Sequence, residues 1–382
     1  MSTKINYSPA VILALVAALV LVSSLLVVEK TSSYQHNTFA QSANGRQEQY
    51  QWTMVTSWPK NLPGLGRGAE NIARFANEMS NGRLQIKVLG AEELVPALGV
   101  FDAVSSGSVE MAHSGAYYWK GKIPAAQFFT TVPFGHNAQE MNGWLFYGGG
   151  MELWSELYAP FDLIPFAAGN SGTQMAGWFN REINSVADLK GLKMRIPGLG
   201  GEVLNRAGGS AVNVPGGELY TAMQTGVIDA TEWVGPYNDL AQSLDQVARY
   251  YYYPGWHDTG PTLELMVNKT AFEGLPADLQ AIVTYAARSV NADMLDDYTY
   301  HNAVALEQLK QNPDIEIRRL PDDVIATLRN ITEEMFVEMA AADPSFKKVW
   351  DSYRDYAKNV RAYHHISEQA YYEARDTGFL AH

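Results

Sequence analysis

Apolar and polar residues alternate in two short segments near the start of the folded part of the chain. Residues 51–58 and 84–89 show this period of two, which is typical of half-buried strands, and Ala69–Ser80 between them has a helical pattern. Asn81 and Gly82 supply a turn after that helix. A strand, a helix and a second strand in succession normally form parallel strands with a right-handed crossover. We therefore expect an α/β fold.

The segment from Asp102 to Met111 aligns without gaps with the segment from Thr221 to Ala230. In both, an amphipathic helix ends at a glycine, and an apolar residue followed by an acidic one opens a short strand two residues later. Few residues are identical, so chance similarity of two helix–Gly–strand units is one interpretation. The other is an internal repeat, which predicts two similarly built lobes whose strands end near one shared feature.

The same patterns predict the remaining elements. Strands are expected at Phe161–Ala168, Met175–Phe179, Leu192–Ile196, Tyr250–Pro254 and Thr262–Asn268, and helices at Ala138–Tyr158 and Ser185–Gly191. From Pro276 onward the pattern is almost entirely helical, with one short strand at Ile315–Ile317. The tail from about Asp322 to Tyr372 carries many aromatic residues between its charges. Packing on the body of the protein explains them most simply, and a second subunit is the alternative.

The composition is that of a globular protein with an acidic surface. The 382 residues are 47% hydrophobic, enough for two domains of ordinary size, and the formal net charge is −13. The 28 basic residues are scattered and form no basic stripe, so we expect no nucleic-acid partner. An anion site in this chain must therefore be local, built from one or two hydrogen-bond donors held in position by the fold. The absence of cysteine excludes disulfides, thiol nucleophiles and cysteine metal sites.

The first 28 residues predict export from the cytoplasm. Lys4 precedes an almost wholly apolar run from Pro9 to Val28, which is typical of a secretory signal. Twenty apolar residues can also span a bilayer, so an uncleaved signal anchor is the alternative to a cleaved signal peptide. Residues 29–49 are mostly polar and predict a flexible tether. In either case we expect the folded body in the periplasm.

Several catalytic and nucleotide-binding motifs are absent from the sequence. There is no Gly-x-x-x-x-Gly-Lys-Ser/Thr loop, no Gly-x-Gly-x-x-Gly fingerprint, no His-Glu-x-x-His metal motif and no Gly-x-Ser-x-Gly elbow. We therefore expect neither a nucleotide cofactor nor an enzymatic activity.

One arginine and one acidic–aromatic pair are the candidates for a ligand site. Arg195 ends a short apolar strand, residues without bulk turn the chain after it, and its planar fork suits a carboxylate. Glu232 and Trp233 also end a predicted strand, before Gly235 and Pro236. A lone arginine at a strand end is more often solvated or ion-paired at the surface, and this is the alternative. If the two strand ends meet, one site can use both.

Three motifs are similar to those of the solute-binding proteins of TRAP transporters, the DctP family. They are Thr56-Ser57-Trp58-Pro59, Lys193-Met194-Arg195-Ile196-Pro197-Gly198 and the unit from Gly226 to Trp233. The resemblance runs from about Tyr50 to the C-terminus, and Glu232, Trp233 and Gln174 resemble the branch that binds 2-oxo acids and lactate. It implies a two-lobed α/β fold like that of periplasmic binding proteins, with a ligand cleft between the lobes and a helical C-terminal tail.

The resemblance also implies roles for individual residues. Arg195 would pair with the carboxylate of a small monocarboxylate, and a cation, sodium or calcium, would bridge ligand and protein. The implied cation ligands are Gln174, Glu232, Trp233 through its carbonyl, and Glu264. The implied substrate contacts are Gln174, Arg195, Trp233, Glu264, Tyr117 and Tyr118. The implied partner is the membrane permease of a TRAP transporter. The alternative is a sensor or scavenger that binds the same ligand and delivers it to a receptor.

The implied domain organisation places residues 50–169 mainly in lobe one and residues 170–268 mainly in lobe two. A helix that bridges the lobes is expected near residues 237–249. Residues 269–382 are expected to form a helical region that packs on both lobes. Some members of the 2-oxo-acid branch dimerise through an exchanged C-terminal helix, so the aromatic tail around Trp350 also implies a homodimer.

Overall fold

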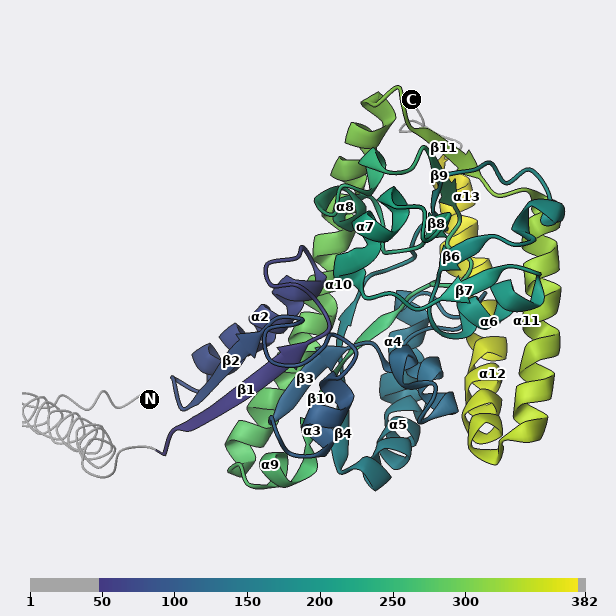
Figure 1. Cartoon of the computed structure of the whole chain (residues 1–382). Coiled ribbons are helices and arrows are strands. Elements are labelled where there is room, and N and C mark those ends of the chain that lie inside the picture. The colour runs from purple at the N-terminus through teal and green to yellow at the C-terminus, as the bar shows by residue number, and fades with distance from the viewer. Residues whose placement is uncertain (1–47, 377–382) are drawn as a thin grey trace, which may run out of the picture. The chain divides into compact units, whose positions relative to one another are not determined.

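The structure is a computed structural model that describes residues 48–376. From Tyr50 onward it contains two β-sheets with helices packed around them (Figure 1). The first sheet has the strand order β2-β1-β3-β10-β4. Its strands are β1 (Tyr50–Thr56), β2 (Leu84–Leu89), β3 (Met111–Ser114), β4 (Leu163–Asn170) and β10 (Thr262–Asn268). Helix α2 (Leu65–Met79) connects β1 with β2, which pair in parallel, so the predicted β-α-β start is confirmed.

The second sheet has the strand order β11-β9-β5-β8-β6-β7. Its strands are β5 (Gly177–Phe179), β6 (Lys193–Arg195), β7 (Ser210–Val212), β8 (Ala230–Thr231), β9 (Tyr250–Tyr253) and β11 (Glu316–Arg319). β6 pairs in parallel with both β7 and β8, whereas β5 pairs antiparallel with β8 and β9. Each sheet with its helices forms one lobe, so the predicted two-lobed α/β class is confirmed.

The chain passes between the two sheets more than once. It leaves the first sheet after β4, returns to it from β9 into β10, and leaves it again for β11. β10 therefore belongs to lobe one, although it falls in the range 170–268 that was expected mainly in lobe two. The sequence of a strand does not indicate which sheet it joins, because its pairing partners lie far away along the chain.

The long helix that links the lobes is α10 (Ala277–Gln311). At about 1.5 Å per residue it spans roughly 50 Å, and it packs on α2 and β4 in lobe one and on α8 in lobe two. The helix expected near residues 237–249 is shorter and begins earlier: α8 covers Pro236–Ala241, and a 3₁₀ turn follows at Leu244–Gln246. Helix α8 also reaches lobe one, since Asn238 Nδ2 donates to the Pro63 carbonyl at 2.6 Å.

The internal repeat is present in three dimensions. Its two helices are α3 (Val100–Ser105) and α7 (Leu219–Gln224), and they lead to β3 and β8 in the two sheets. Gly107 and Gly226 both adopt the left-handed conformation, with φ of 72° and 70°. In each copy the two amides after that glycine donate to one helix carbonyl, that of Ala103 or Ala222. The acid at the start of each strand accepts a backbone N–H from the neighbouring parallel strand in both copies.

Glycines also divide a helix that was expected to be continuous. The segment Ala138–Tyr158 forms α4 (Ala138–Tyr147) and α5 (Gly150–Tyr158), separated by Gly148 and Gly149. Gly149 has a φ of 87°, which a right-handed helix does not allow. The remaining helices of the two lobes are α6 (Gly198–Arg206) and α9 (Lys269–Glu273), with 3₁₀ turns η1 (Ala116–Trp119) and η2 (Pro124–Phe129).

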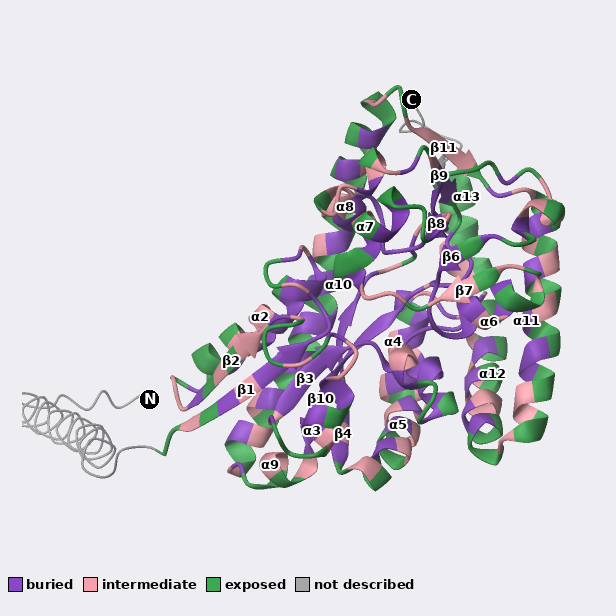
Figure 2. Cartoon of the chain, in the orientation of Figure 1, coloured by how far each residue is buried: buried purple, intermediate pink, exposed green. Residues whose placement is uncertain are grey.

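The C-terminal region is helical, as predicted. It comprises α11 (Asp322–Ala342), α12 (Pro344–His364), a π-helical turn at His365–Gln369 and α13 (Ala370–Asp376). Tyr353 on α12 is buried, and its hydroxyl oxygen accepts the backbone N–H of His136 at 2.6 Å. Trp350 stacks on Phe336 with the ring centroids 4.3 Å apart. Buried residues gather along the sheets and along one face of α10, α11 and α12 (Figure 2).

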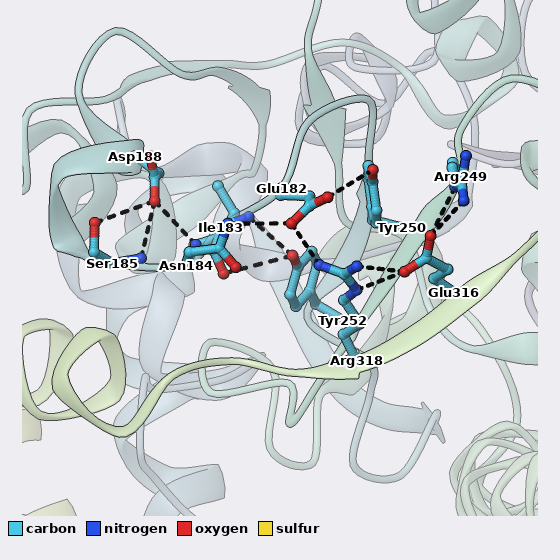
Figure 3. Close-up of polar contacts among 10 residues, drawn as sticks. All are labelled: Glu182, Ile183, Asn184, Ser185, Asp188, Arg249, Tyr250, Tyr252, Glu316 and Arg318. Carbon is cyan, nitrogen blue, oxygen red and sulfur yellow. Dashed lines mark hydrogen bonds and ion pairs between the residues drawn. The ribbon is translucent and has the colours of Figure 1, made fainter.

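A network of exposed charged side chains holds the edge of the second sheet (Figure 3). Arg318 on β11 donates from Nη1 to Glu182 Oε2 at 2.8 Å and from Nε to Glu316 Oε2 at 2.9 Å. The hydroxyl of Tyr250 on β9 donates to the other oxygen of Glu182 at 3.1 Å. These hydrogen bonds, that of Arg318 above all, lower the pKa of Glu182 to about 2. The network ties the loop after β5 to a strand contributed from far along the chain.

The expected signal segment, residues 1–28, and most of the expected tether, residues 29–49, lie outside the described residues. Among the residues that the structure describes, no helix has both the length and the apolar character needed to cross a membrane.

Candidate ligand and cation site

Arg195 is a buried residue at the carboxyl end of β6, so the alternative of a solvated surface arginine does not hold. Its Nε donates to the carbonyl of Val214 at 3.1 Å, and its Nη2 donates to the hydroxyl of Tyr118 at 3.2 Å. Its Nη1 donates to the carbonyl of Glu232 at 3.3 Å and forms a short ion pair with the carboxylate of the same residue. Burial would lower the pKa of Arg195, but the neighbouring Glu232 carboxylate outweighs it and the pKa is raised.

Sheet pairing explains why Glu232 meets Arg195. β6 and β8 are parallel neighbours with Arg195 opposite Thr231, so the next residue, Glu232, lies beside the arginine at the same edge. The Trp233 ring then lies over the guanidinium, with 5.2 Å between Arg195 Cζ and the ring centroid. The strand ends that the sequence suggested for one shared site therefore do lie together, on adjacent strands of lobe two (Figure 1).

Lobe one contributes aromatic residues to the same place. The Trp58 ring lies 6.3 Å from the Trp233 ring and 6.2 Å from the Tyr118 ring. Tyr117 packs edge-on against Tyr118 at 4.5 Å and lies against Gly198, where an added Cβ would come within 3.1 Å of the tyrosine Cβ. Burial raises the pKa of both tyrosines, so their hydroxyls stay protonated and can donate. Tyr118 thus connects the lobes through its contact with Arg195.

Gln174 belongs to a group of converging oxygen atoms. Its Nε2 donates to Ser171 Oγ at 2.8 Å, and its Oε1 then faces the Trp233 carbonyl at 2.8 Å and Asp258 Oδ2 at 3.3 Å. Turning the amide over satisfies both of its ends, because Nε2 then donates to those two oxygens and Oε1 accepts from Ser171. In the first orientation three oxygens meet without a proton between them, which is the arrangement that a hard cation requires. In the second, the amide protons take the place of the cation.

Two residues of this site were missed in the sequence. His257 and Asp258 lie in the loop between β9 and β10. A ring nitrogen of His257, a carboxylate oxygen of Asp258 and a carboxylate oxygen of Glu232 all lie within 4.8 Å of one another. Burial, with the nearby Glu232 charge, raises the pKa of Asp258 to about 7, although His257 and Arg195 oppose the rise. The available signal was a pair of titratable residues in a short segment bounded by Gly255, Gly260 and Pro261 between two strands.

Glu264 does not join these residues, which corrects the expectation that it shares their site. One of its carboxyl oxygens accepts from Trp119 Nε1 at 2.5 Å and the other from the Tyr158 hydroxyl at 2.8 Å. Trp119 and Tyr158 both belong to the aromatic core of lobe one, so the Glu264 side chain lies in that core. Burial raises its pKa to about 7 despite the two donors.

The internal repeat clarifies the different roles of the lobes. By the alignment of the two segments, the position of Glu232 in lobe two corresponds to His113 in lobe one. His113 Nδ1 accepts from Trp58 Nε1 at 2.9 Å, its Nε2 lies 3.0 Å from the Ala168 carbonyl, and burial lowers its pKa to about 4. Lobe one therefore presents neutral and aromatic groups, and lobe two carries the charges of the site.

The fold and the site together define a class: a two-lobed α/β protein with a buried arginine where strand ends of one lobe meet aromatic residues of the other. A family model described as bacterial extracellular solute-binding protein, family 7, matches residues 54–343. The chain belongs to this family, the DctP solute-binding proteins of TRAP transporters, and is a periplasmic binding protein rather than an enzyme.

Three relatives illustrate the similarity. A monocarboxylate 2-oxoacid-binding periplasmic protein of Nostoc sp. strain PCC 7120 is 45% identical over 84% of this chain and 87% of its own length. A TRAP periplasmic solute-binding protein of Pseudoalteromonas atlantica, solved with bound sodium and pyruvate, is 45% identical with a TM-score of 0.83, over 85% of this chain and 99% of that one. A TRAP solute-binding protein of Bordetella bronchiseptica, a dimer solved with calcium and picolinate in one active site, is 34% identical with a TM-score of 0.85, over 86% and 98% of the chains.

Proposed function

We propose that this protein binds a small 2-oxo monocarboxylate such as pyruvate between its lobes, together with a cation, and delivers it to a TRAP permease. The observation that carries the proposal is the buried Arg195 beside a cluster in which the Gln174 amide meets the Trp233 carbonyl at 2.8 Å and Asp258 Oδ2 at 3.3 Å. An arginine fork suits a carboxylate, and the converging oxygens suit a hard cation. The sodium–pyruvate and calcium–picolinate complexes of the relatives support the same pairing of acid and cation.

The charges of the site explain why a cation is needed. Arg195 provides one positive charge, while Glu232 and Asp258 are acidic, and a ligand carboxylate adds a further negative charge. Burial raises the pKa of Asp258 and the Glu232 charge adds to the rise, so a further negative charge in this buried place is disfavoured. The residues that would hold the cation are Gln174, Trp233 through its carbonyl, Asp258 and Glu232. When bound, the cation would neutralise the acids and offer a partner to the keto oxygen of the ligand.

Tyr117 and Tyr118 are the proposed ligand contacts of lobe one, and Gln174, Arg195 and Trp233 those of lobe two. Because the Tyr118 hydroxyl already reaches Arg195, a ligand on the arginine would contact both lobes at once. Such a contact favours the closed arrangement of the lobes, which is the arrangement a permease could distinguish from the open one.

Metal removal tests this proposal. The full protein is stripped of metal by chelation in a choline buffer, and pyruvate affinity is measured by calorimetry before and after sodium or calcium is returned. Since binding of acid and cation must favour each other equally, we expect pyruvate affinity to rise by tenfold or more with the correct ion. Equal affinity with and without either ion would remove the cation from the proposal. A response to only one of them would identify the metal.

The delivery step has an alternative, in which the protein presents its ligand to a receptor instead of a permease. Genes for the small and large permease subunits beside this one would favour transport, and a neighbouring receptor kinase gene would favour sensing. Pyruvate uptake by cells that carry the permease, with and without this protein, decides between them.

We also propose that the protein forms a homodimer in which the end of one C-terminal helix docks on the other copy. A groove of about 850 Å³ lies between α11, α12 and the loop around Phe134, with Phe336, Trp350 and Tyr353 in its lining. Its charged lining is mostly basic, with one acid, Glu333, beside four cationic side chains: Arg329, Arg354, Lys358 and Arg361. The helix end from Tyr363 onward exposes apolar residues together with acids. They are Tyr363, Ile366, Tyr371 and Tyr372, with Glu368 and Glu373.

The dimer proposal rests on the match between this aromatic, basic groove and that aromatic, acidic helix end, and the dimeric Bordetella relative supports it. Light scattering of the full protein is compared with that of a Tyr371→Asp/Tyr372→Asp variant. We expect a dimer for the parent and a monomer for the variant, with unchanged pyruvate affinity. A parent that stays monomeric at high micromolar concentration would exclude the dimer.

A further inference from the structure

His257 is a buried side chain of the site whose hydrogen-bonding capacity is unused. It is only 2% exposed, and neither of its ring nitrogens has a hydrogen-bond partner among the described residues. Its Nε2 lies 3.5 Å from Glu232 Oε2, just outside an ordinary hydrogen bond. A buried imidazole left without a partner is unfavourable, and such groups in native proteins usually have a partner in some functional state.

Close packing surrounds the imidazole. The first turn of α6 lies directly against it, since a Cβ added to Gly200 would come within 2.9 Å of His257 Cβ. The Trp256 ring lies edge-on to it, with the centroids 5.4 Å apart. The side chain is thus oriented by its neighbours' shape, and its polar atoms are left free for another contact.

Glu232 is the group beside His257 whose contacts must change when a ligand binds. One of its carboxylate oxygens is paired with Arg195 Nη1, and the other faces His257. One nitrogen of the Arg195 fork, Nη1, is therefore occupied by an internal carboxylate. A ligand that takes the fork deprives Glu232 of this donor and brings a second negative charge close to it.

We infer that His257 is a positioning residue for the ligand site: it holds the Glu232 carboxylate through Nε2–H when the ligand carboxylate occupies Arg195. Glu232 then exchanges one donor for another and stays with the oxygens of Gln174, Trp233 and Asp258, where it serves the cation. The inference rests on the proposed function, because it assumes a carboxylate ligand on Arg195.

Two substitutions separate hydrogen bonding from shape. His257→Phe keeps a planar ring but removes the donor, and His257→Gln places an amide N–H near the position of the imidazole Nε2. Calorimetry with pyruvate in sodium buffer should show affinity about tenfold or more weaker for the Phe variant, and within about threefold of the parent for the Gln variant. The gain in affinity on adding sodium should also shrink in the Phe variant alone. His365→Phe, at an exposed histidine of the C-terminal region, is the matched control and should bind as the parent does.

A second measurement is made on the unmodified chain, and a variant serves only to assign its signals. In ¹⁵N-labelled protein, His257→Gln identifies the His257 signals among those of the 8 histidines. Adding pyruvate with sodium should shift the Nε2–H signal of His257 to the position of a hydrogen-bonded imidazole. An unshifted signal, or a Phe variant that binds pyruvate as tightly as the parent, would overturn the inference and leave the proposed function intact. A parent protein that binds no 2-oxo acid with either cation would overturn both.

Discussion

Replacing Arg195 by lysine is the sharpest test of the ligand anchor, because it keeps the positive charge and removes the fork. The guanidinium supplies three nitrogens to four acceptors: the Val214 carbonyl, the Tyr118 hydroxyl, and the carbonyl and carboxylate of Glu232. A lysine ammonium is a single point and can keep the ion pair with Glu232, but it cannot also reach Val214 and Tyr118, which lie on other sides of the guanidinium.

The size of the effect follows from these contacts. A ligand carboxylate on Arg195→Lys loses one of two parallel charge-assisted hydrogen bonds, about 1.5–3 kcal/mol. This corresponds to an affinity for pyruvate that is weaker by roughly 10- to 150-fold. Stability should fall as well, by about 1–3 kcal/mol for each buried acceptor that is left without a donor. The two effects are separate, because affinity concerns the ligand and stability concerns Val214 and Tyr118.

Calorimetric titration of pyruvate at fixed sodium concentration measures the affinity, and thermal unfolding without ligand measures the stability. Arg249→Lys is the matched control, since Arg249 is an exposed arginine at the edge of the same sheet, paired with Glu316. We expect the control to bind and melt as the parent does. If Arg195→Lys binds pyruvate within about threefold of the parent, the arginine does not anchor the ligand and the assignment of the site is refuted.

Three further predictions concern the cation, pH and the repeat. Asp258→Asn removes one charge from the oxygen cluster, so we expect sodium or calcium to bind at least about tenfold more weakly. Titration of pyruvate at varied ion concentration measures this, and an unchanged ion dependence would contradict the role of the cluster. Glu264 has a pKa of about 7 in the folded protein against an ordinary value of 4.5, so the folded state binds the extra proton between these values. Stability should therefore fall by up to about 3 kcal/mol as the pH rises from about 4.5 to above 7. In Glu264→Gln, whose amide suits Trp119 and Tyr158 at any pH, urea unfolding at pH 5 and pH 8 should show a smaller fall than in the parent. Gly226→Ala should lower the unfolding free energy by about 1 kcal/mol, because its φ is 70° while nothing lies within 4 Å of the added Cβ. Gly121→Ala, with equally open space and no positive φ, should have no such cost in the same thermal unfolding experiment.

The local elements and the two-lobed class follow from the sequence by itself. Alternation predicted β1 and β2, the glycines at 107 and 226 marked the two copies of the repeat, and the helical pattern after Pro276 predicted the C-terminal region. These features depend on neighbours along the chain, where periodicity and the conformational freedom of glycine act directly. The same reasoning brought Arg195 and Glu232 near one another, because both lie at the ends of strands that pair in parallel in one sheet.

Only the tertiary structure decided which carboxylates share the site. Glu264 and Asp258 are only six residues apart, where the chain returns from the second sheet to the first. Yet Glu264 faces the aromatic core of lobe one, and Asp258 faces Gln174 and Glu232. Which sheet β10 joins decides this, and that depends on pairing with β3 and β4, more than ninety residues away in sequence. Alternating apolar and polar residues give a strand its two faces but not its neighbours, so the partners of a buried acid are set only when distant strands pack together.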